Sequence, residues 1–451
     1  MTTLADRIRG IVAPAAPRPP AAIPDPQPPS RDPLAAALVE LGGASSDGTV
    51  VIERRWNPAA RYGSETIGDA AHRLNVAADN APLIAGSDAT APFVFFDLET
   101  TGLSGGAGTH AFLVGCGSFD QDGGFVTRQF LMLQYAAEPS MLRTVAGELA
   151  RAGAIVSFNG KSFDAPVLET RYAFHRMAWV GAQLPHIDVL HPARQFWGSP
   201  KGLRYGGQVL SYERGEDGTV AQAFRPGSAE GSCTLQALER KVVGCRTRTG
   251  DVPGFEIPAR YFAFVRSGDP RPLVPVLEHN RRDLLTLALL TSRLLHLARA
   301  GADLAGSAAE ALALGKLYVR AGQNGRASDA FTRAVEMSRA PAGAYDPVRI
   351  DAVRALAVLC RRGRQFDQAA AWWQALMNTR GCPPAILCEA AEALAIHHEH
   401  RVRDLDAART FALKSLDADT KPSWKRAVDY RLARLERKAG RGARLSFGPL
   451  G

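Results

Sequence analysis

The pattern of apolar residues along the chain changes near residue 300. Before that point, short apolar runs of strand length alternate with longer amphipathic stretches of helix length. This alternation predicts an α/β domain with five strands. The runs that predict the strands are 93–103, 111–119, 125–133, 154–158 and 185–190.

The stretches between and after these runs predict the helices. Ser140 is placed to cap a helix over 140–152. A further helix begins near Ser162, with Asp164 in its first turn. Helices are also predicted at 234–243 and 258–266, and Glu278 begins the regular part of a long apolar helix.

Beyond about Asp303 the strand pattern stops and alanine-rich amphipathic helices follow. Three short segments recur, and their alanines Ala330, Ala369 and Ala408 are each 39 residues apart (369 − 330 and 408 − 369). A small residue at a fixed period is typical of stacked helix pairs. These features resemble tetratricopeptide-like repeats, so we expect a helical repeat domain over 303–445 that either binds a partner or buttresses the first domain.

The N-terminal part of the chain carries weaker patterns. Residues 1–33 are rich in proline and lack the apolar core of a signal peptide, so we expect a disordered tail. Residues 34–90 contain a predicted helix near 34–41 and a predicted strand near 49–54, and we interpret them as an N-terminal extension packed on the α/β domain of residues 91–300. A glycine-rich, charged stretch over 198–232 predicts a surface insertion.

Composition narrows the class of protein. Hydrophobic residues make up 46% of the 451 positions, which is ample for two folded domains. The net charge of +9 permits a polyanionic partner. The six cysteines include no C-x-x-C pair, so a zinc site is not expected. No apolar stretch reaches membrane-spanning length, and a cytoplasmic protein is the simplest interpretation.

The strand predicted from Phe93 ends in two carboxylates, Asp97 and Glu99. Side chains alternate along a strand, so both carboxylates project to one face. Two neighbouring anions in an apolar strand are unfavourable unless a cation lies between them. The pair therefore indicates a divalent metal with oxygen ligands. The simpler interpretation is that the two residues mark where a strand leaves the core.

Further carboxylates favour the interpretation that this region is a metal site. Asp164 follows a buried strand and a glycine turn, at the start of a helix. His279 and Asp283 are four residues apart, which places them on one helical face. In this order the motifs resemble the DEDD, or DnaQ-like, exonucleases of the ribonuclease H-like superfamily, which carry a D-x-E strand, an N-x(3–4)-F-D segment and a later [YH]-x(3–4)-D helix.

The resemblance is closer to the YprB-type family of these exonucleases. It rests on "DLETTGLSGGAGTHAFLVG", "FNGKSFDAPVLETR", "HIDVLHPAR" and "LEHNRRDLLTL", and it covers about residues 90 to 300. It implies a ribonuclease H-like domain, in which helices flank a mixed five-stranded sheet whose first three strands form a meander. It also implies a 3′-to-5′ exonuclease that uses two Mg²⁺ or Mn²⁺ ions. The implied metal ligands are Asp97, Glu99, Asp164 and Asp283. His279 is the implied general base, although its spacing to Asp283 is that of the tyrosine-type branch.

Several neighbouring residues are candidates for substrate binding or support. Thr100, Thr101 and Gly102 directly follow the ligand strand, where amides and hydroxyls are placed to hold a terminal nucleotide, although Gly102 also suits a turn. Asn159 and Lys161 either contact the substrate or form a plain turn and a solvated loop. Asp188 is either a supporting carboxylate or a helix cap. A basic rim beside the acidic pocket is expected from cationic residues at 240, 241, 246, 248, 260 and 266.

The resemblance favours nucleic acid as substrate, with single-stranded DNA or 3′ ends in a repair context and a helicase as a protein partner. RNA fits the same chemistry, because discrimination depends on contacts to the 2′ hydroxyl that a sequence does not show. Endonuclease action on a branched structure is a further alternative. A non-catalytic scaffold that binds nucleic-acid ends and recruits partners through its repeats is the competing hypothesis of another class.

Overall fold

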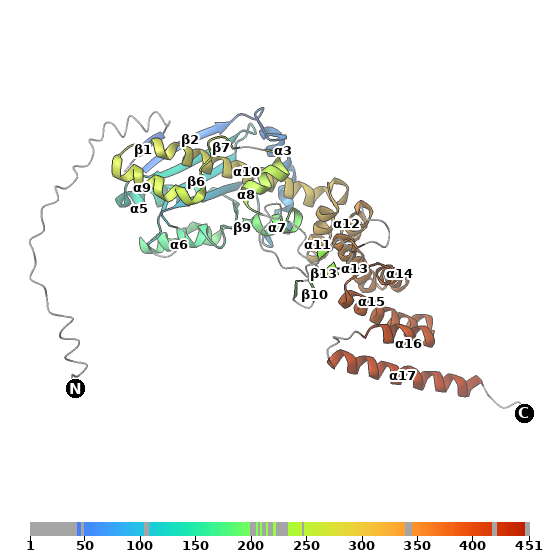
Figure 1. Ribbon diagram of the computed structural model, residues 1–451. Coiled ribbons are helices and arrows are strands. Elements are labelled where there is room, and N and C mark those ends of the chain that lie inside the picture. Colours follow the sequence, from blue (N-terminus) through green and yellow to red (C-terminus); the bar gives the residue numbers. More distant parts are fainter. Residues whose placement is uncertain are drawn as a thin grey trace, which may run out of the picture.

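The computed structural model describes residues 43–46, 49–102, 108–198, 204–205, 208–209, 213–214, 220–221, 233–245, 248–338, 345–416 and 422–446. The predicted tail, the helix predicted near 34–41 and most of the predicted insertion lie outside these ranges. The described parts form a sheet domain followed by an array of helices, joined by one long helix (Figure 1).

Seven strands form one mixed sheet in the order β1-β2-β7-β6-β5-β8-β9. Its centre is the predicted antiparallel meander of β5 (Phe93–Thr100), β6 (Ala111–Phe119) and β7 (Phe125–Met132). Beyond β5, the strands β8 (Ala154–Ser157) and β9 (His186–Asp188) run parallel to it. All five predicted strands are therefore present, but the predicted number of strands is wrong.

The two additional strands come from the N-terminal extension. β2 (Thr49–Trp56) pairs along its whole length with β7, and β1 (Gly43–Ser46) pairs with β2. Without β2, the N–H and C=O groups of β7 would form an exposed edge of the sheet. The extension is thus part of the sheet, and the strand predicted at 49–54 is confirmed.

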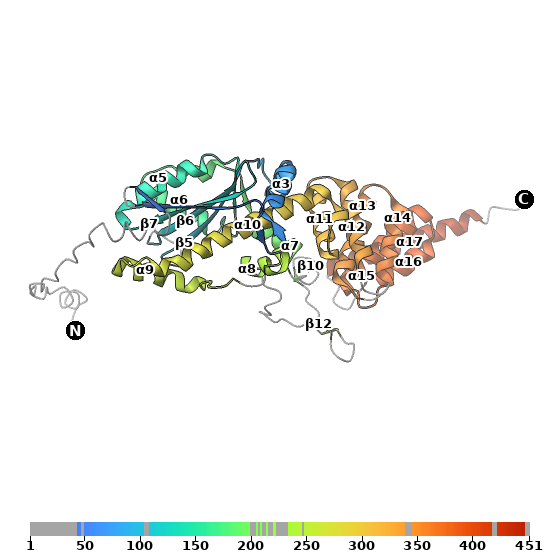
Figure 2. The same cartoon turned by 90° about the horizontal axis from the view of Figure 1, so that it is seen from above.

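Two helices cover one face of the sheet, α5 (Glu138–Leu149) and α6 (Asp164–Phe174) (Figure 2). The predicted cap at Ser140 is wrong, because α5 begins at Glu138 with proline in its first turn. Proline suits the first turn, where its missing N–H would have no helical partner. Glu138 is buried and accepts a hydrogen bond from Arg171 of α6 at 2.7 Å, which ties the two helices together.

The opposite face carries α10 (Val274–Ala300), which crosses the sheet and runs on toward the helical array (Figure 2). Its leucines share a hydrophobic core with Phe95 and Phe125 of the sheet. α3 (Ile67–Ala77) lies beside α10, and the hydroxyl of Ser292 donates to the carbonyl of Ala70 at 2.8 Å. The long helix predicted around Glu278 is confirmed, and it begins one turn earlier.

Shorter helices complete this side of the domain. Thr234 caps α8 (Leu235–Leu238), which continues as the π-helical turn η5 (Glu239–Val243), and α9 (Ile257–Ser267) follows. These are the helices predicted at 234–243 and 258–266. α7 (Leu190–Phe196) connects the sheet domain to the array, where the indole N–H of Trp197 donates to buried Glu310 at 2.7 Å.

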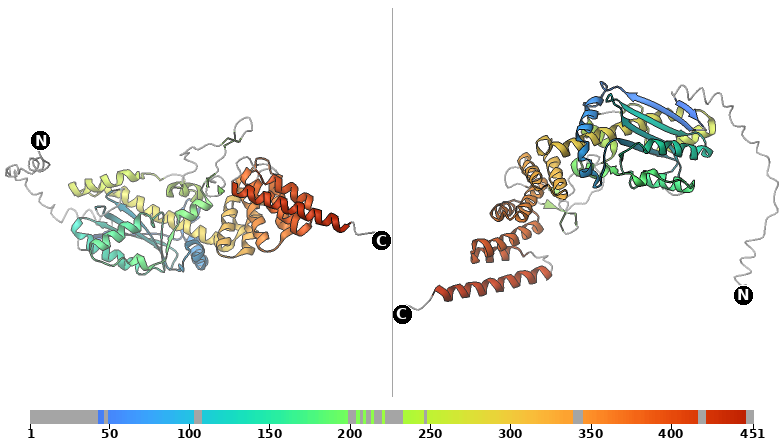
Figure 3. Two further views of the ribbon diagram at one scale, coloured as in Figure 1. Left: turned by 90° about the horizontal axis from the view of Figure 1, so that it is seen from below. Right: turned by 180° about the vertical axis from the view of Figure 1, so that it is seen from behind.

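The C-terminal region is helical throughout its described residues, and Figure 3 shows it extending away from the sheet. Ala330, Ala369 and Ala408 lie on alternate helices, and all three are buried at helix contacts. The predicted period of helix pairs is thus present. The helices are α11 (Ala308–Arg320), α12 (Asn324–Met337), α13 (Pro347–Arg362), α14 (Phe366–Met377), α15 (Pro384–His397), η9 (His398–Val402), α16 (Leu405–Lys414) and α17 (Pro422–Ser446).

The remaining elements are small. Among the described residues, no helix combines the length and the apolar composition needed to cross a membrane. The short strands and helices are β3 (Arg61–Tyr62), β4 (Glu65–Thr66), α4 (Ala81–Ala85), β10 (Arg204–Tyr205), β11 (Gln208–Val209), β12 (Glu213–Arg214), β13 (Val220–Ala221) and 3₁₀ turns at 78–80, 135–137, 180–183, 254–256, 271–273 and 302–304.

Candidate active site

Asp97 and Glu99 lie near the end of β5, on the face that α10 covers. Because strand side chains alternate, they share this face with Phe93 and Phe95, which contact the core beneath α10. Glu99 is only 9% exposed. The strand therefore brings two carboxylates into the narrow space between the sheet and the long helix.

A glycine on the neighbouring strand lets α10 approach closely. Gly115 of β6 is the pairing partner of Asp97, and a Cβ there would lie 2.1 Å from the side-chain oxygen of Asn280. The Asn280 amide donates to an Asp97 carboxylate oxygen at 2.9 Å and accepts from Gln129 at 2.9 Å. Asn280 thus holds Asp97 in place. The sequence analysis did not identify it, although it stands beside His279 in the quoted motif.

His279 and Asp283 project from one face of α10, as their spacing predicts. His279 Nε2 lies 3.4 Å from an Asp283 oxygen, and His279 Nδ1 lies 2.6 Å from Asp251. Because the Asp251 carboxylate accepts hydrogen bonds, Nδ1 carries the proton and Nε2 faces Asp283. Sequence reasoning missed Asp251, since it lies in an irregular segment 28 residues before His279.

Arg248 is buried at the centre of this cluster. Its guanidinium lies 2.5 Å from Asp283 and 2.6 Å from Glu239, and its side chain is 6% exposed. Burial alone would lower the pKa of Arg248, but the two carboxylates raise it, so the group stays charged. The predicted basic rim beside the acidic pocket includes this arginine, which lies beside the acidic residues but inside the cluster rather than at its rim. Arg246, another residue of the predicted rim, lies outside the described residues.

Asp164 is the first residue of α6 and follows a tightly held loop. Asp188 accepts backbone hydrogen bonds from Asn159 at 2.8 Å and from Lys161 at 3.2 Å. It also accepts one from the N–H of Leu190 at 3.1 Å, but the N-cap residue of α7 is Val189, so Asp188 supports the loop and is not the helix cap. The loop comes close because Gly160 has no side chain; a Cβ there would lie 2.9 Å from an Asp164 oxygen.

The four carboxylates influence one another strongly. Burial, and then the nearby charges of Asp283 and Asp164, raise the pKa of Asp97 well above its usual range. Burial, Asp97, Asp283 and Asp164 do the same to the pKa of Glu99. Burial and Asp188 raise the pKa of Asp164 to about 7, and burial raises that of Asp283. The cluster thus carries more buried negative charge than its surroundings neutralise.

The remaining candidates lie at the rim of the cluster. The hydroxyl of Thr100 donates to the carbonyl of Gly102 at 2.8 Å, and Thr101 exchanges hydrogen bonds with His110. The backbone at Gly102 is not left-handed, so a turn does not require glycine there. Asn159 has φ of 66° and begins the loop, and Lys161 is exposed.

The donor set suits a hard divalent cation. Carboxylate oxygens are the preferred ligands of Mg²⁺ and Mn²⁺, and a cation would relieve the repulsion that raises these pKa values. Within the described ranges, no three His, Cys, Asp or Glu side chains converge as closely as metal ligands do. The chemistry of the donors therefore fits metal ions, whereas the described carboxylates are spaced more widely than in a formed metal site.

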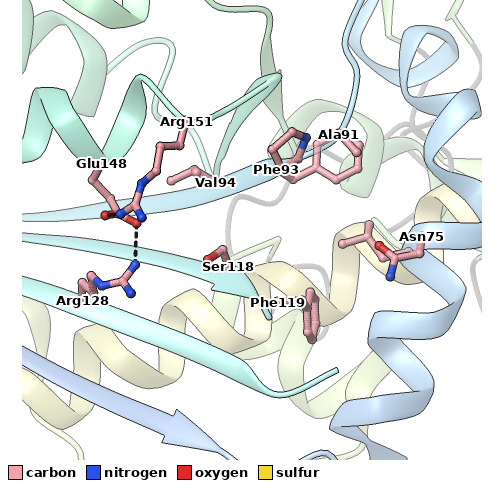
Figure 4. A pocket seen from close by; sticks show the side chains of 11 residues that line it. Asn75, Ala91, Phe93, Val94, Ser118, Phe119, Arg128, Glu148 and Arg151 are labelled. Carbon is pink, nitrogen blue, oxygen red and sulfur yellow. Dashed lines mark hydrogen bonds and ion pairs between the residues drawn. The ribbon is translucent and has the colours of Figure 1, made fainter. Parts of the chain in front are cut away.

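A hollow of about 170 Å³ lies at the opposite end of β5 from the carboxylates. Figure 4 shows Phe93 and Val94 lining it, with Arg128 joined to Glu148 by an ion pair of 3.0 Å. The same Glu148 also pairs with Arg151. Since Glu148 already neutralises these arginines, and the carboxylates lie at the other end of the strand, this cavity plays no part in the candidate site.

Comparison with known proteins identifies the class of domain. Residues 94–295 match a family model described as RNase_H superfamily. The matched range begins in β5 and ends in α10, so it contains all four carboxylates. The mixed sheet, its flanking helices and this match define a ribonuclease H-like domain.

A bacterial relative extends the similarity beyond that domain. The chain is 28% identical over 351 residues to "Uncharacterized protein YprB" of Bacillus subtilis (strain 168). The match covers 76% of this chain and 74% of that protein. Such coverage exceeds the ribonuclease H-like domain alone and agrees with the resemblance seen in the sequence motifs.

Proposed function

We propose that this protein is a metal-dependent nuclease that removes nucleotides from the 3′ end of a nucleic acid. One observation carries the proposal: Asp283 of α10 and Asp164 of α6 lie close enough to Asp97 and Glu99 of β5 to add to the effect of burial and raise the pKa of both. Structural carboxylates are normally paired one to one with cations, whereas Arg248 pairs with Asp283 alone among these four, so the group calls for further positive charge.

Asp97, Glu99, Asp164 and Asp283 would hold two Mg²⁺ or Mn²⁺ ions. When bound, such ions activate a water molecule and stabilise the negative charge that develops on the leaving oxygen of a phosphodiester. The chain itself supplies the orientation of the ligands. Asn280 fixes Asp97, and the Asp188-bound loop fixes the start of the helix that carries Asp164.

His279 is placed to accept a proton from the attacking water. Its Nδ1–H is engaged by Asp251 at 2.6 Å, and Nε2 faces Asp283 at 3.4 Å. Imidazole is the side chain that most often acts as a general base, and Nε2 is the ring nitrogen that faces the cluster. The substrate end would lie over Thr100, Thr101 and Gly102, with Asn159 and Lys161 on the other side of the cluster.

DNA in a repair context, with a helicase as partner, follows from the family resemblance. RNA is the alternative substrate of the same chemistry. The net charge of +9 suits either polyanion, so the choice between them belongs to experiment.

One observation favours a second candidate, a scaffold that binds nucleic-acid ends without cleaving them. The Arg248 guanidinium already lies against Asp283 at 2.5 Å and supplies positive charge to the cluster. If that contact persisted with metal ions present, Asp283 would be a poor metal ligand.

The experiment uses single-stranded DNA, duplex DNA and RNA, each labelled in turn at the 5′ and the 3′ end. A 3′-to-5′ exonuclease turns the 5′ label into a descending ladder and releases the 3′ label as a mononucleotide from the start. The nucleic acid that is degraded fastest is the preferred substrate. Internal cuts that give discrete long products from both labels would identify an endonuclease, and tight binding without cleavage would identify the scaffold.

A further inference from the structure

A groove of about 440 Å³ lies between α11 and α13 of the helical array. Its floor is apolar, formed by Val319 of α11 and by Ala355, Val358 and Leu359 of α13, with buried Phe331 of α12 beneath them. The α13 residues are spaced three and four apart, so they line one face of that helix. The volume falls in the range of pockets that bind ligands.

Four cations surround this floor. Lys316 and Arg320 come from α11, and Arg354 and Arg362 come from α13. Among the described residues that line the groove, none is acidic. The groove therefore combines an apolar floor with a positively charged rim.

Two of the four cations are neutralised by neighbours outside the groove. Lys316 lies 2.6 Å from Asp351, and Arg354 lies 2.6 Å from Glu389. These acids reduce the field of the rim on those two sides. They also fix the two side chains in place.

The other two cations keep their charge available. Arg320 donates to the neutral side-chain oxygen of Gln195 at 3.3 Å. Within the described part of the chain, neither Arg320 nor Arg362 forms an ion pair with a carboxylate, and both residues are exposed. Two positive charges thus remain uncompensated beside an apolar surface.

We propose that this groove binds an acidic peptide segment of a partner protein, with one apolar side chain of the peptide on the floor and its carboxylates at Arg320 and Arg362. Charge complementarity at the rim selects acidic segments, and burial of the apolar side chain supplies affinity. The proposal does not depend on the nuclease activity, because no residue of the groove belongs to the carboxylate cluster.

The lining argues for a peptide over a nucleic acid. Proteins that bind single strands place exposed aromatic rings against the bases. Phe331 is the aromatic residue among the described lining, and it is 1% exposed. An aliphatic floor accommodates a leucine-like side chain instead.

Fluorescence anisotropy on the full-length protein tests the proposal. The probes are a labelled peptide with one leucine between aspartates and glutamates, a version with lysines in place of the acids, a version with serine in place of the leucine, and a labelled oligothymidylate. We expect the first peptide to bind with a micromolar dissociation constant and each altered peptide to bind at least about tenfold more weakly.

Two charge reversals on α13 form a matched pair. Arg362→Glu changes the groove, whereas Arg361→Glu changes an exposed neighbour that does not line it. We expect Arg362→Glu to weaken binding of the acidic peptide about tenfold and Arg361→Glu to leave it within about twofold. Circular dichroism confirms that both variants remain folded.

Three results would overturn the proposal. The first is the absence of saturable binding of the acidic peptide below millimolar concentration, and the second is equal binding by the two variants. The third is an oligothymidylate that binds in place of the peptide and loses affinity on Arg362→Glu, which would make the groove a nucleic-acid site.

Discussion

At the scale of single residues, the carboxylate cluster at the end of β5 carries negative charge that the nearby positive charge does not fully neutralise. Arg248 provides one positive charge, and Asn280 provides a hydrogen bond to Asp97 at 2.9 Å. Neither offsets burial and the repulsion from Asp283 and Asp164, which together raise the pKa of Asp97 well above its usual range. Without added cations, the protein therefore stores unfavourable electrostatic energy at this site.

This leads to a prediction for Asp97→Asn. A carboxylate whose pKa is raised in the folded state destabilises the protein as pH rises above its unfolded pKa. The amide removes that term, so the metal-free variant should melt at a higher temperature than the wild type at neutral and alkaline pH. Mg²⁺ or Mn²⁺ should raise the melting temperature of the wild type but not of the variant. Equal metal-induced shifts in thermal melts of both proteins would contradict the proposed ligand.

Gly115 gives a second prediction, because its missing side chain admits Asn280. Gly115→Ala would place a methyl group 2.1 Å from the Asn280 oxygen. We expect a loss of about 1–3 kcal/mol in the free energy of unfolding, and nuclease activity about 10- to 100-fold lower because Asp97 loses its support.

The matched control for that variant is Gly147→Ala on α5, where a Cβ meets nothing within 4 Å. Alanine in an exposed helix interior should raise stability by about 0.5–1 kcal/mol. Urea denaturation measures both variants. Similar effects of the two substitutions would contradict the close approach of α10 to β6.

Residues of the candidate site could be predicted from the sequence where a local pattern indicates their chemistry. Asp97, Glu99, Asp164 and Asp283 follow from strand alternation, helix spacing and family motifs. Asp251 and Arg248 were not predictable as neighbours of His279 and Asp283, because they come from an irregular segment that only the tertiary fold brings back to α10.

At the scale of elements, one buried carboxylate contributes to the contact between the last helix and the array. Glu399 of η9 accepts hydrogen bonds from Arg434 at 2.8 Å and from Lys438 at 2.8 Å, both on α17. Burial opposes its ionisation, but the two cations outweigh burial and lower its pKa to about 2. The ionised form thus stabilises the contact between η9 and α17.

The pH dependence of this contact has a definite sign. The folded pKa of about 2 lies below the ordinary value of 4.5, so the stabilisation is complete above 4.5 and is lost as pH falls toward 2. It amounts to about 3 kcal/mol for this contact. Hydrogen exchange of α17 should accelerate across that window in the wild type. Glu399→Gln should show fast exchange already at neutral pH, whereas Glu436→Gln, an exposed change on α17, should behave as the wild type.

Most helices and strands could be predicted because their apolar residues recur at the regular spacing of a helix or a strand. The strand at 49–54 was recognised, yet its place in the sheet was not, since pairing with β7 is a contact between segments 75 residues apart, as between Glu53 and Arg128. The start of α5 was missed because proline at its first turn is easily mistaken for a helix breaker.

At the scale of the whole molecule, the sheet domain and the first helices of the array share one core. The cluster that contains Phe95 and Leu284 continues without interruption to Leu314 and Leu356. α10 belongs to both parts, and Trp197 links to Glu310 across the junction. α17, in contrast, contributes Val428 to a small separate cluster.

We therefore expect α11 and α13 to unfold together with the sheet, and α17 to open first. Native-state hydrogen exchange with mass spectrometry measures this order directly. Peptides from α10, α11 and α13 should show similar protection, and peptides from α17 should show less. Exchange of α11 and α13 well before the sheet would mean that the array is an independent domain.

The central claim is that the carboxylate cluster cleaves phosphodiesters with divalent metal ions. The most direct measurement is cleavage of 5′-labelled single-stranded DNA and RNA by the wild type, Asp97→Asn and Asp283→Asn, each with Mg²⁺, Mn²⁺ or EDTA. We expect cleavage by the wild type with metal, none in EDTA, and at least about a hundredfold loss in both variants. Cleavage that survives in either variant or in EDTA, or a wild type that binds both strands without cutting them, would contradict the account.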